Sequence, residues 1–353
     1  MSHLNQKRTG ISLLEVLISI GVIALGIFGV ATLIPVAQFK VAEGTALDRI
    51  AAFGPSAAAE FRIRNMGSPN NWVVSPFANI KIAASTPGES SDNSGVLSKG
   101  FVIDPLGVIQ GRQLFFPSPP TGVQPSNALQ QMPWLMPRLN LTNTFTSNPL
   151  VNERLAQKIF YLGDDVDFDR PDEQEKQPRR QYFIDSSTGR PVSTVPGAQL
   201  SWFATLSPVA TPGVTSDEFV LSIVICKGRT PESQFIEQTE HDVAVQPTNF
   251  PGEIVVANDP LVSELKPGDW ILVAKSNAPN SATTWVYRWT QVIGTSDEDT
   301  DKLTGERTFS ISNDDIIIRP NETGRIFFVT GVESIFERTI RIQNTNAWDE
   351  QSF

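Results

Sequence analysis

Residues 11–37 read ISLLEVLISIGVIALGIFGVATLIPVA, and this stretch decides how the rest of the chain is interpreted. Its only charged residue is Glu15. About 20 apolar residues in a helix suffice to cross a bilayer, whereas the apolar region of an ordinary secretory signal has roughly 7 to 15 residues. The stretch therefore predicts a transmembrane helix over residues 11–37.

A short polar leader, MSHLNQKRTG, precedes the apolar run as residues 1–10. Lys7 and Arg8 lie directly before the run. Basic residues next to a span tend to stay in the cytoplasm. The leader is therefore expected on the cytoplasmic side, with the bulk of the chain exported.

Glu15 is the unusual residue of the run. On insertion scales a carboxylate in an apolar span costs about 2.5 to 3.5 kcal/mol at the helix centre and less near an end, so it needs a partner. If the chain is cut between Gly10 and Ile11, the new α-ammonium group of one chain can pair with Glu15 of a neighbour. Such a pair offsets two desolvation costs and fixes the axial register of the two helices.

These residues match a known pattern. The leader segment KRTG at 7–10 and the run ISLLEVLI at 11–18 resemble the class III signal of type IV prepilins and type II secretion pseudopilins. The resemblance covers about the first 40 residues. It implies that a prepilin peptidase cuts after Gly10 and methylates Ile11, and that Glu15 is the carboxylate used in filament assembly. Ile11 replaces the commoner Phe, which together with the large head is more similar to a minor pilin or minor pseudopilin.

The resemblance implies a structural subunit of a type IV pilus or type II secretion pseudopilus. Its partners would be the prepilin peptidase, other pilin or pseudopilin subunits and inner-membrane lipid. Its location would be the bacterial inner membrane, crossed once, with the head exported to the periplasm or cell surface. The alternative is a membrane-tethered binding protein or enzyme that uses the apolar helix as an uncleaved signal-anchor.

Beyond the apolar run, an amphipathic pattern predicts that the helix continues to residue 66, because Ala46, Ile50 and Phe53 share one face. Gly54-Pro55 is expected to interrupt it, with Pro55 opening a second helical segment. From residue 70 the composition changes to short apolar runs between turn residues. The predicted fold class is α+β, with a long N-terminal transmembrane or filament helix before a mainly antiparallel β head.

The head is divided provisionally into a pilin-like part at 70–240 and a further β-rich part or added module at 241–353, with the boundary near 238–251. Runs rich in β-branched and aromatic residues predict its strands. These runs are residues 101–109, 199–206, 219–226, 253–257, 270–274, 284–293, 315–319 and 325–329.

Composition argues against several other functions. The net charge of −10 argues against nucleic-acid binding. The single cysteine, Cys226, forms no intrachain disulfide and ends an apolar run, where a buried small side chain is expected. The sequence has two histidines, His3 and His241, which offer little support for a histidine-dependent catalytic site. Known catalytic and nucleotide-binding motifs are absent from the sequence. We therefore expect neither an enzyme nor a cofactor.

Two local features leave alternatives open. Asp165, Asp167 and Asp169 begin like a calcium-binding EF-hand loop, but Arg170 occupies the position that requires glycine. An irregular calcium loop and a solvated acidic loop both remain possible there. Separately, the alternating aromatics Trp285, Tyr287 and Trp289 form either a binding face or the packed face of a sheet.

Overall fold

The computed structural model describes residues 13–75, 80–81, 100–109, 114–119, 131–142, 151–162, 182–184, 191–193, 200–209, 218–227, 229, 240–248, 250–257, 262, 265–276, 285–295, 306–313 and 315–342. The chain forms two compact units. One comprises Met1–Ala51 and the other Ala52–Phe353.

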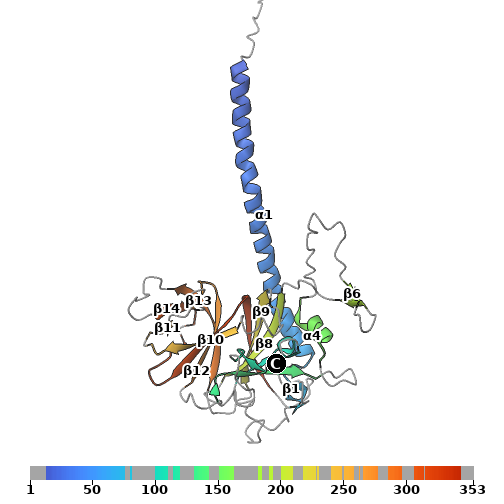
Figure 1. Ribbon diagram of the computed structural model, residues 1–353, viewed down its shortest axis with the longest axis vertical. Coiled ribbons are helices and arrows are strands. Elements are labelled where there is room, and N and C mark those ends of the chain that lie inside the picture. The colour runs from blue at the N-terminus through green and yellow to red at the C-terminus, as the bar shows by residue number, and fades with distance from the viewer. Residues whose placement is uncertain are drawn as a thin grey trace, which may run out of the picture. The chain divides into compact units, whose positions relative to one another are not determined.

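Helix α1 runs from Leu13 to Ile63 and is continuous across Gly54 and Pro55 (Figure 1). The predicted interruption is therefore wrong. A Cβ added at Gly54 would lie 2.9 Å from Cβ of Phe336, so the glycine permits close packing rather than a helix break. Phe53 and Phe61 are buried on either side, and this packing offsets the hydrogen bond that Pro55 cannot donate.

The second unit contains an eight-stranded sheet in the order β16-β9-β8-β3-β5-β1-β2, with β4 also paired to β5. All pairs are antiparallel except β3 with β5. The strands are β1 (Trp72–Ser75), β2 (Ile80–Lys81), β3 (Phe101–Ile103), β4 (Phe115–Phe116), β5 (Met136–Leu141), β8 (Leu200–Pro208), β9 (Glu218–Lys227) and β16 (Val332–Arg341). The short helices that accompany them are η1 (Pro69–Asn71), α2 (Pro105–Ile109) and α4 (Glu153–Phe160), and β6 (Tyr182–Ile184) pairs with β7 (Pro191–Ser193).

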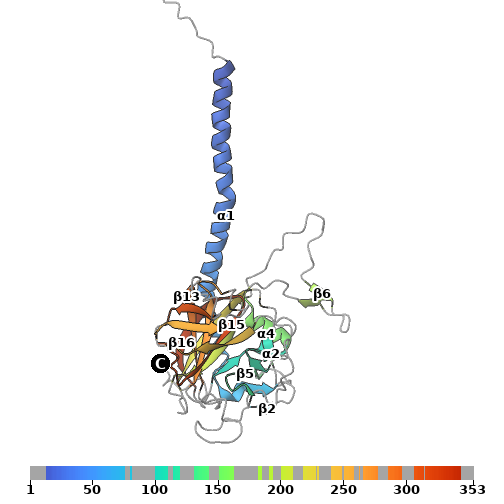
Figure 2. The same cartoon turned by 60° about the vertical axis from the view of Figure 1, so that its left-hand side comes forward.

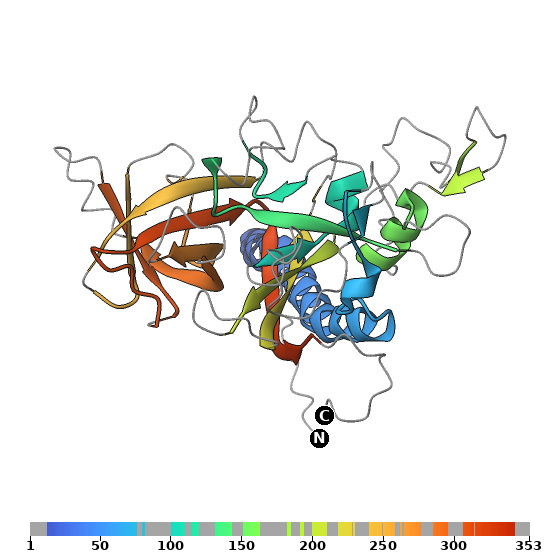
Figure 3. The same cartoon turned by 90° about the horizontal axis from the view of Figure 1, so that it is seen from below.

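Six further strands close into a barrel in the order β10-β11-β14-β13-β12-β15. Their bounds are β10 (Glu240–Gln246), β11 (Glu253–Ala257), β12 (Trp270–Ser276), β13 (Val286–Thr295), β14 (Glu306–Ile311) and β15 (Thr323–Val329). Aliphatic residues fill the inside together with Phe309 and Phe328, because alternate side chains of each strand point inward. Figures 2 and 3 show the barrel beside the sheet, with α4 on the side of the sheet away from the barrel.

The barrel is an insertion into one connection of the sheet. Strand β9 ends at Lys227, and its antiparallel neighbour β16 begins at Val332, so the whole barrel lies between two paired strands. The backbone N–H of Lys227 donates to the carbonyl of Gly331 at 2.7 Å, which closes the connection where the chain returns. Gly331 has a φ of +81°, a conformation that glycine adopts without strain.

The predicted α+β fold class needs correction. Strands make up most of the described regular structure, and they form a closed barrel as well as an antiparallel sheet, so the chain is mainly β. The strand predictions fail where a turn or helix intervenes: residues 105–109 form α2, and residues 315–319 form no strand. Asp104 hydrogen-bonds to the backbone N–H of Gly107 and so favours a helical turn there.

The transmembrane prediction also needs correction. The described side chains of α1 exclude those of Glu15 and of residues 30–32, 35, 36, 39, 42, 43 and 46. Within what is described, no helix meets the length and hydropathy that a membrane crossing requires. This finding contradicts the predicted span over residues 11–37 and, with it, the predicted single-pass location in an inner membrane.

Candidate functional site

The residues predicted to act in processing lie at the start of the chain. Gly10 and Ile11 fall outside the described residues. Glu15 lies within α1, although its side chain is not described. The predicted cleavage, methylation and assembly roles of these three residues therefore stay predictions.

Among the described side chains in the first half of α1, the large apolar ones are exposed. Leu13 is 80% exposed, and Leu25 and Phe28 are each 75% exposed. A helix that is apolar all round is normally buried by other protein or an apolar phase. This stretch is called the exposed apolar stretch below, and its large exposed members are Leu13, Leu14, Val16, Leu17, Ile18, Ile20, Val22, Ile23, Leu25, Ile27, Phe28, Leu33 and Ile34.

The weak calcium candidates Asp165, Asp167 and Asp169 lie outside the described residues. Among the residues that are described, no group of three or more His, Cys, Asp or Glu side chains could hold a metal ion.

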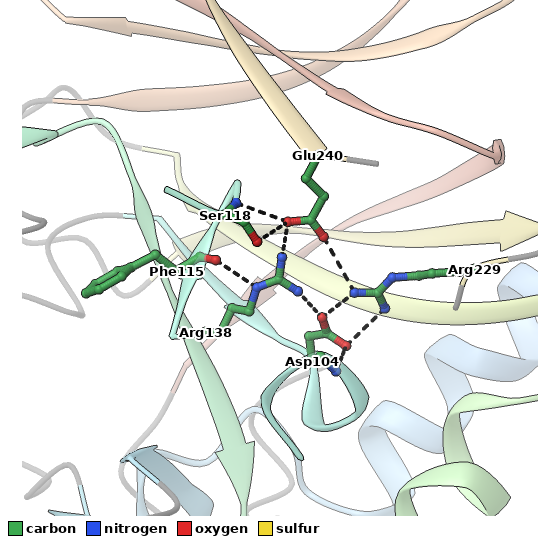
Figure 4. Close-up of polar contacts among 7 residues, drawn as sticks. Asp104, Phe115, Ser118, Arg138, Arg229 and Glu240 are labelled. Carbon is green, nitrogen blue, oxygen red and sulfur yellow. Dashed lines mark hydrogen bonds and ion pairs between the residues drawn. The ribbon is translucent and has the colours of Figure 1, made fainter. Parts of the chain in front are cut away.

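The second unit contains a buried cluster of four charged residues, which Figure 4 shows in close-up. Asp104 follows β3, Arg138 lies on β5, Arg229 follows β9, and Glu240 is the first residue of β10. Three of them belong to the sheet or its connections and the fourth to the barrel. Their side chains are 0 to 5% exposed, so the two positive and two negative charges compensate each other away from solvent.

Arg138 joins the sheet to the barrel through its guanidinium group. Its Nη1 donates to Asp104, its Nη2 donates to Oε2 of Glu240, and its Nε donates to the carbonyl of Phe115 at 2.9 Å. The guanidinium carbon lies 5.2 Å from the centre of the Phe116 ring. Every edge of the guanidinium plane thus has a partner, which is the condition for burying an arginine.

Asp104 is held by a second arginine. Nη1 of Arg229 donates to Oδ1 of Asp104 at 3.0 Å, and Nη2 donates to Oδ2. The backbone N–H of Gly107 donates to Oδ1 at 3.1 Å. A Cβ at Gly107 would come within 2.2 Å of Oδ2 of Asp104 and 2.6 Å of Nη1 of Arg138, so only glycine fits against this arrangement.

Glu240 is held less completely. Its Oε2 accepts from the backbone N–H of Ser118 at 3.2 Å and from the Ser118 hydroxyl at 3.4 Å, in addition to Arg138. Its Oε1 has no hydrogen-bond partner in the described part of the chain and lies 3.8 Å from Nη2 of Arg229. Glu240 is therefore the member that depends most on Arg138.

The electrostatics of the cluster favour its charged form. Burial alone would raise the pKa of Asp104, but the charges of Arg229 and Arg138 outweigh it and hold that pKa at about 2. Burial alone would lower the pKa of Arg229, but Asp104 raises it above its usual range. Asp104 and Arg229 thus carry full charges at neutral pH, and the arrangement of the cluster can hold two parts of the fold together.

Sequence reasoning missed this cluster because its members are far apart in the chain. Arg138 stands in the segment MPRLNL, where every residue is buried, and a lone arginine among apolar residues is the one available signal. That signal indicates a buried partner, but it identifies neither Asp104 nor Glu240.

Two other sequence expectations can be placed. Trp285, Tyr287 and Trp289 are 1 to 5% exposed and pack into the apolar cluster shared by barrel and sheet, which agrees with a packed face. Cys226 is buried, as predicted, and burial raises the pKa of its thiol to about 12.

No protein-family model matches the chain, and no curated protein matches it.

Proposed function

We propose that this protein is a structural subunit of a filament of the type IV pilin or pseudopilin kind, cleaved after Gly10 and assembled through α1. The observation that carries the proposal is the exposed apolar stretch. Water does not tolerate an apolar surface of this extent, and exposed patches of this kind mark sites of association. Because the apolar residues surround the helix, several neighbours are needed to cover it.

The occupant is other subunits with the same helix. An all-round apolar surface is covered best by equally apolar helices, as in a helical bundle. Glu15 adds charge complementarity, because the α-ammonium group of a neighbour that begins at Ile11 is its natural partner. The separation of Met1–Ala51 from the second unit supports a division of labour, with α1 for assembly and the β-rich unit for partner contacts.

The test is a disulfide trap. The single cysteine is buried, so a Cys226→Ala background carrying Leu25→Cys offers one reactive thiol in the exposed apolar stretch. The chain is co-expressed with a prepilin peptidase, its intact mass is measured, and mild oxidant is added. We expect loss of residues 1–10 and a disulfide-linked dimer.

The matched control is Val209→Cys in the same background, since Val209 is 41% exposed in the second unit and lies outside α1. It is expected to give less dimer than Leu25→Cys at equal protein level. An unprocessed N-terminus, or equal dimer yields for the two positions, contradicts the proposal.

A further inference from the structure

The inserted barrel is joined to the sheet covalently at only two points, after β9 and before β16. Apolar contact between the two is extensive: Phe203 and Val224 of the sheet share one cluster with Leu272 and Phe327 of the barrel. Apolar contact of this kind is strong but non-directional. It favours association of barrel and sheet without selecting one orientation.

Directional contacts also join barrel and sheet. The indole N–H of Trp134 donates to Oδ2 of Asp242 at 2.8 Å, and the hydroxyl oxygen of Ser207 accepts from the backbone N–H of Tyr287 at 3.2 Å and from Arg288 at 3.1 Å. The indole N–H of Trp289 donates to Thr205 at 2.9 Å, and the hydroxyl of Tyr287 donates to the carbonyl of Trp134 at 2.9 Å.

Charges of opposite sign meet inside the molecule where Arg138 of β5 reaches Glu240 of β10. Both of these side chains are at most 1% exposed. Displacing the barrel would therefore separate Glu240 from both arginines and leave Arg138 and Arg229 facing the single carboxylate of Asp104, which is unfavourable for buried charges.

We propose that the Arg138–Glu240 ion pair is an orientation lock that couples the barrel to the sheet, so that the two open and unfold together. Asp104, which Arg229 holds, contacts Arg138 from the sheet side, and Ser118 donates to Glu240. This inference concerns the second unit alone and does not rest on the proposed role of α1.

Two single variants and their combination distinguish an orientation lock from a simple requirement for charge balance in the cluster. Arg138→Met leaves two carboxylates facing one arginine, and Glu240→Gln leaves two arginines facing one carboxylate. The double variant, Arg138→Met with Glu240→Gln, keeps Asp104 and Arg229 as one balanced pair. Charge balance returns in the double variant, but the ionic link to the barrel does not.

The experiment is amide hydrogen exchange by mass spectrometry on the full-length chain. In the parent, peptides of β11 and β14 in the barrel and of β8 and β9 in the sheet are expected to share one slowest exchange rate. In the double variant, the barrel peptides are expected to exchange at least tenfold faster while the sheet peptides change less than threefold. The conservative variant Glu240→Asp provides an intermediate case if the double variant fails to fold, with a smaller difference in the same direction.

The control is the exposed ion pair between Arg341 of β16 and Glu218 of β9, whose side chains are 58% and 38% exposed. Arg341→Met with Glu218→Gln removes a pair within the sheet and should leave both rates within twofold of the parent. Equal acceleration of barrel and sheet in the Arg138/Glu240 variants, or no acceleration, overturns the lock.

Discussion

The exposed apolar stretch of α1 and the buried charge cluster of the second unit differ in how they place costly groups. The first exposes apolar side chains, and the second buries charged ones. In the cluster, four charges that would be costly to bury singly are satisfied by one another and by backbone groups. In α1, large apolar side chains face outward, up to 80% exposed for Leu13. The charged groups of the cluster have partners within the same chain, whereas the exposed apolar stretch of α1 is open to solvent.

This difference indicates where each region acts. A self-satisfied cluster stabilises a single arrangement of the fold, so changing it should alter stability. A surface that lacks partners should respond differently, because changes there should alter association and leave the stability of the second unit unchanged.

The largest expected effect is on assembly. Glu15→Val should leave cleavage after Gly10 intact but weaken incorporation into filaments by a hundredfold or more. Its removal leaves the neighbour's ammonium group buried without a partner, and breaking such a pair typically costs about 3 to 5 kcal/mol. The measurement is the yield of crosslinks between cleaved subunits at matched protein level.

Asp48→Asn is the matched control for Glu15→Val, since Asp48 is an exposed carboxylate on the same helix beyond the apolar run. It should crosslink like the parent. If cleaved Glu15→Val does so too, α1 does not use Glu15 in assembly and this half of the comparison fails.

The next effect is a pH dependence of the cluster. The folded-state pKa of Asp104 is about 2, below its ordinary value of 3.8, so its stabilising contribution is complete above pH 4 and is lost as the pH falls towards 2. The gap in unfolding free energy between parent and Asp104→Asn should therefore shrink by about 2 kcal/mol from pH 5 to pH 2. Urea titrations at both pH values measure it, and a constant gap would show that Asp104 is not held as a charged group.

The smallest effect concerns the point where the barrel rejoins the sheet. Gly331 and Gly268 both have positive φ, +81° and +103°, but only at Gly331 would a Cβ meet a backbone oxygen, that of Lys227 at 2.4 Å. Gly331→Ala should therefore cost about 1 kcal/mol more than Gly268→Ala. Thermal unfolding measures the loss of stability in each variant. Equal losses would mean that the backbone around Lys227 shifts to accommodate the added Cβ.

Sequence reasoning succeeded where a local pattern carries the information. The β-branched and aromatic content of β8, β9, β11 and β13 is a property of a few adjacent residues, and strands were expected at each. Prediction failed where residues that are distant in the sequence determine the structure. The barrel depends on β10 pairing with β15 at the other end of the insertion, and local composition does not encode such a closure. The break expected at Gly54-Pro55 failed for the same reason, because Phe336 of a distant strand packs there.

The candidate sites divide in the same way. The assembly residues could be proposed because they stand together in one short motif, whereas Arg138 and Glu240 are 102 positions apart and meet only in the folded chain. A lone buried arginine indicates that it has a partner, but the local sequence does not identify that partner. Local sequence therefore contains the motif from which the assembly residues are proposed, whereas it does not reveal the contacts of the buried cluster.

The most direct test of assembly through α1 is zero-length crosslinking with a carbodiimide, which joins a carboxylate to an amine only when the two are in contact. Filaments are formed from a mixture of isotopically light and heavy subunits and then digested for mass spectrometry. We expect an amide bond between the Glu15 side chain of a subunit of one isotope and the Ile11 α-amine of a subunit of the other. Assembled subunits whose only Glu15 crosslinks lie within one chain, or that retain residues 1–10, would contradict it.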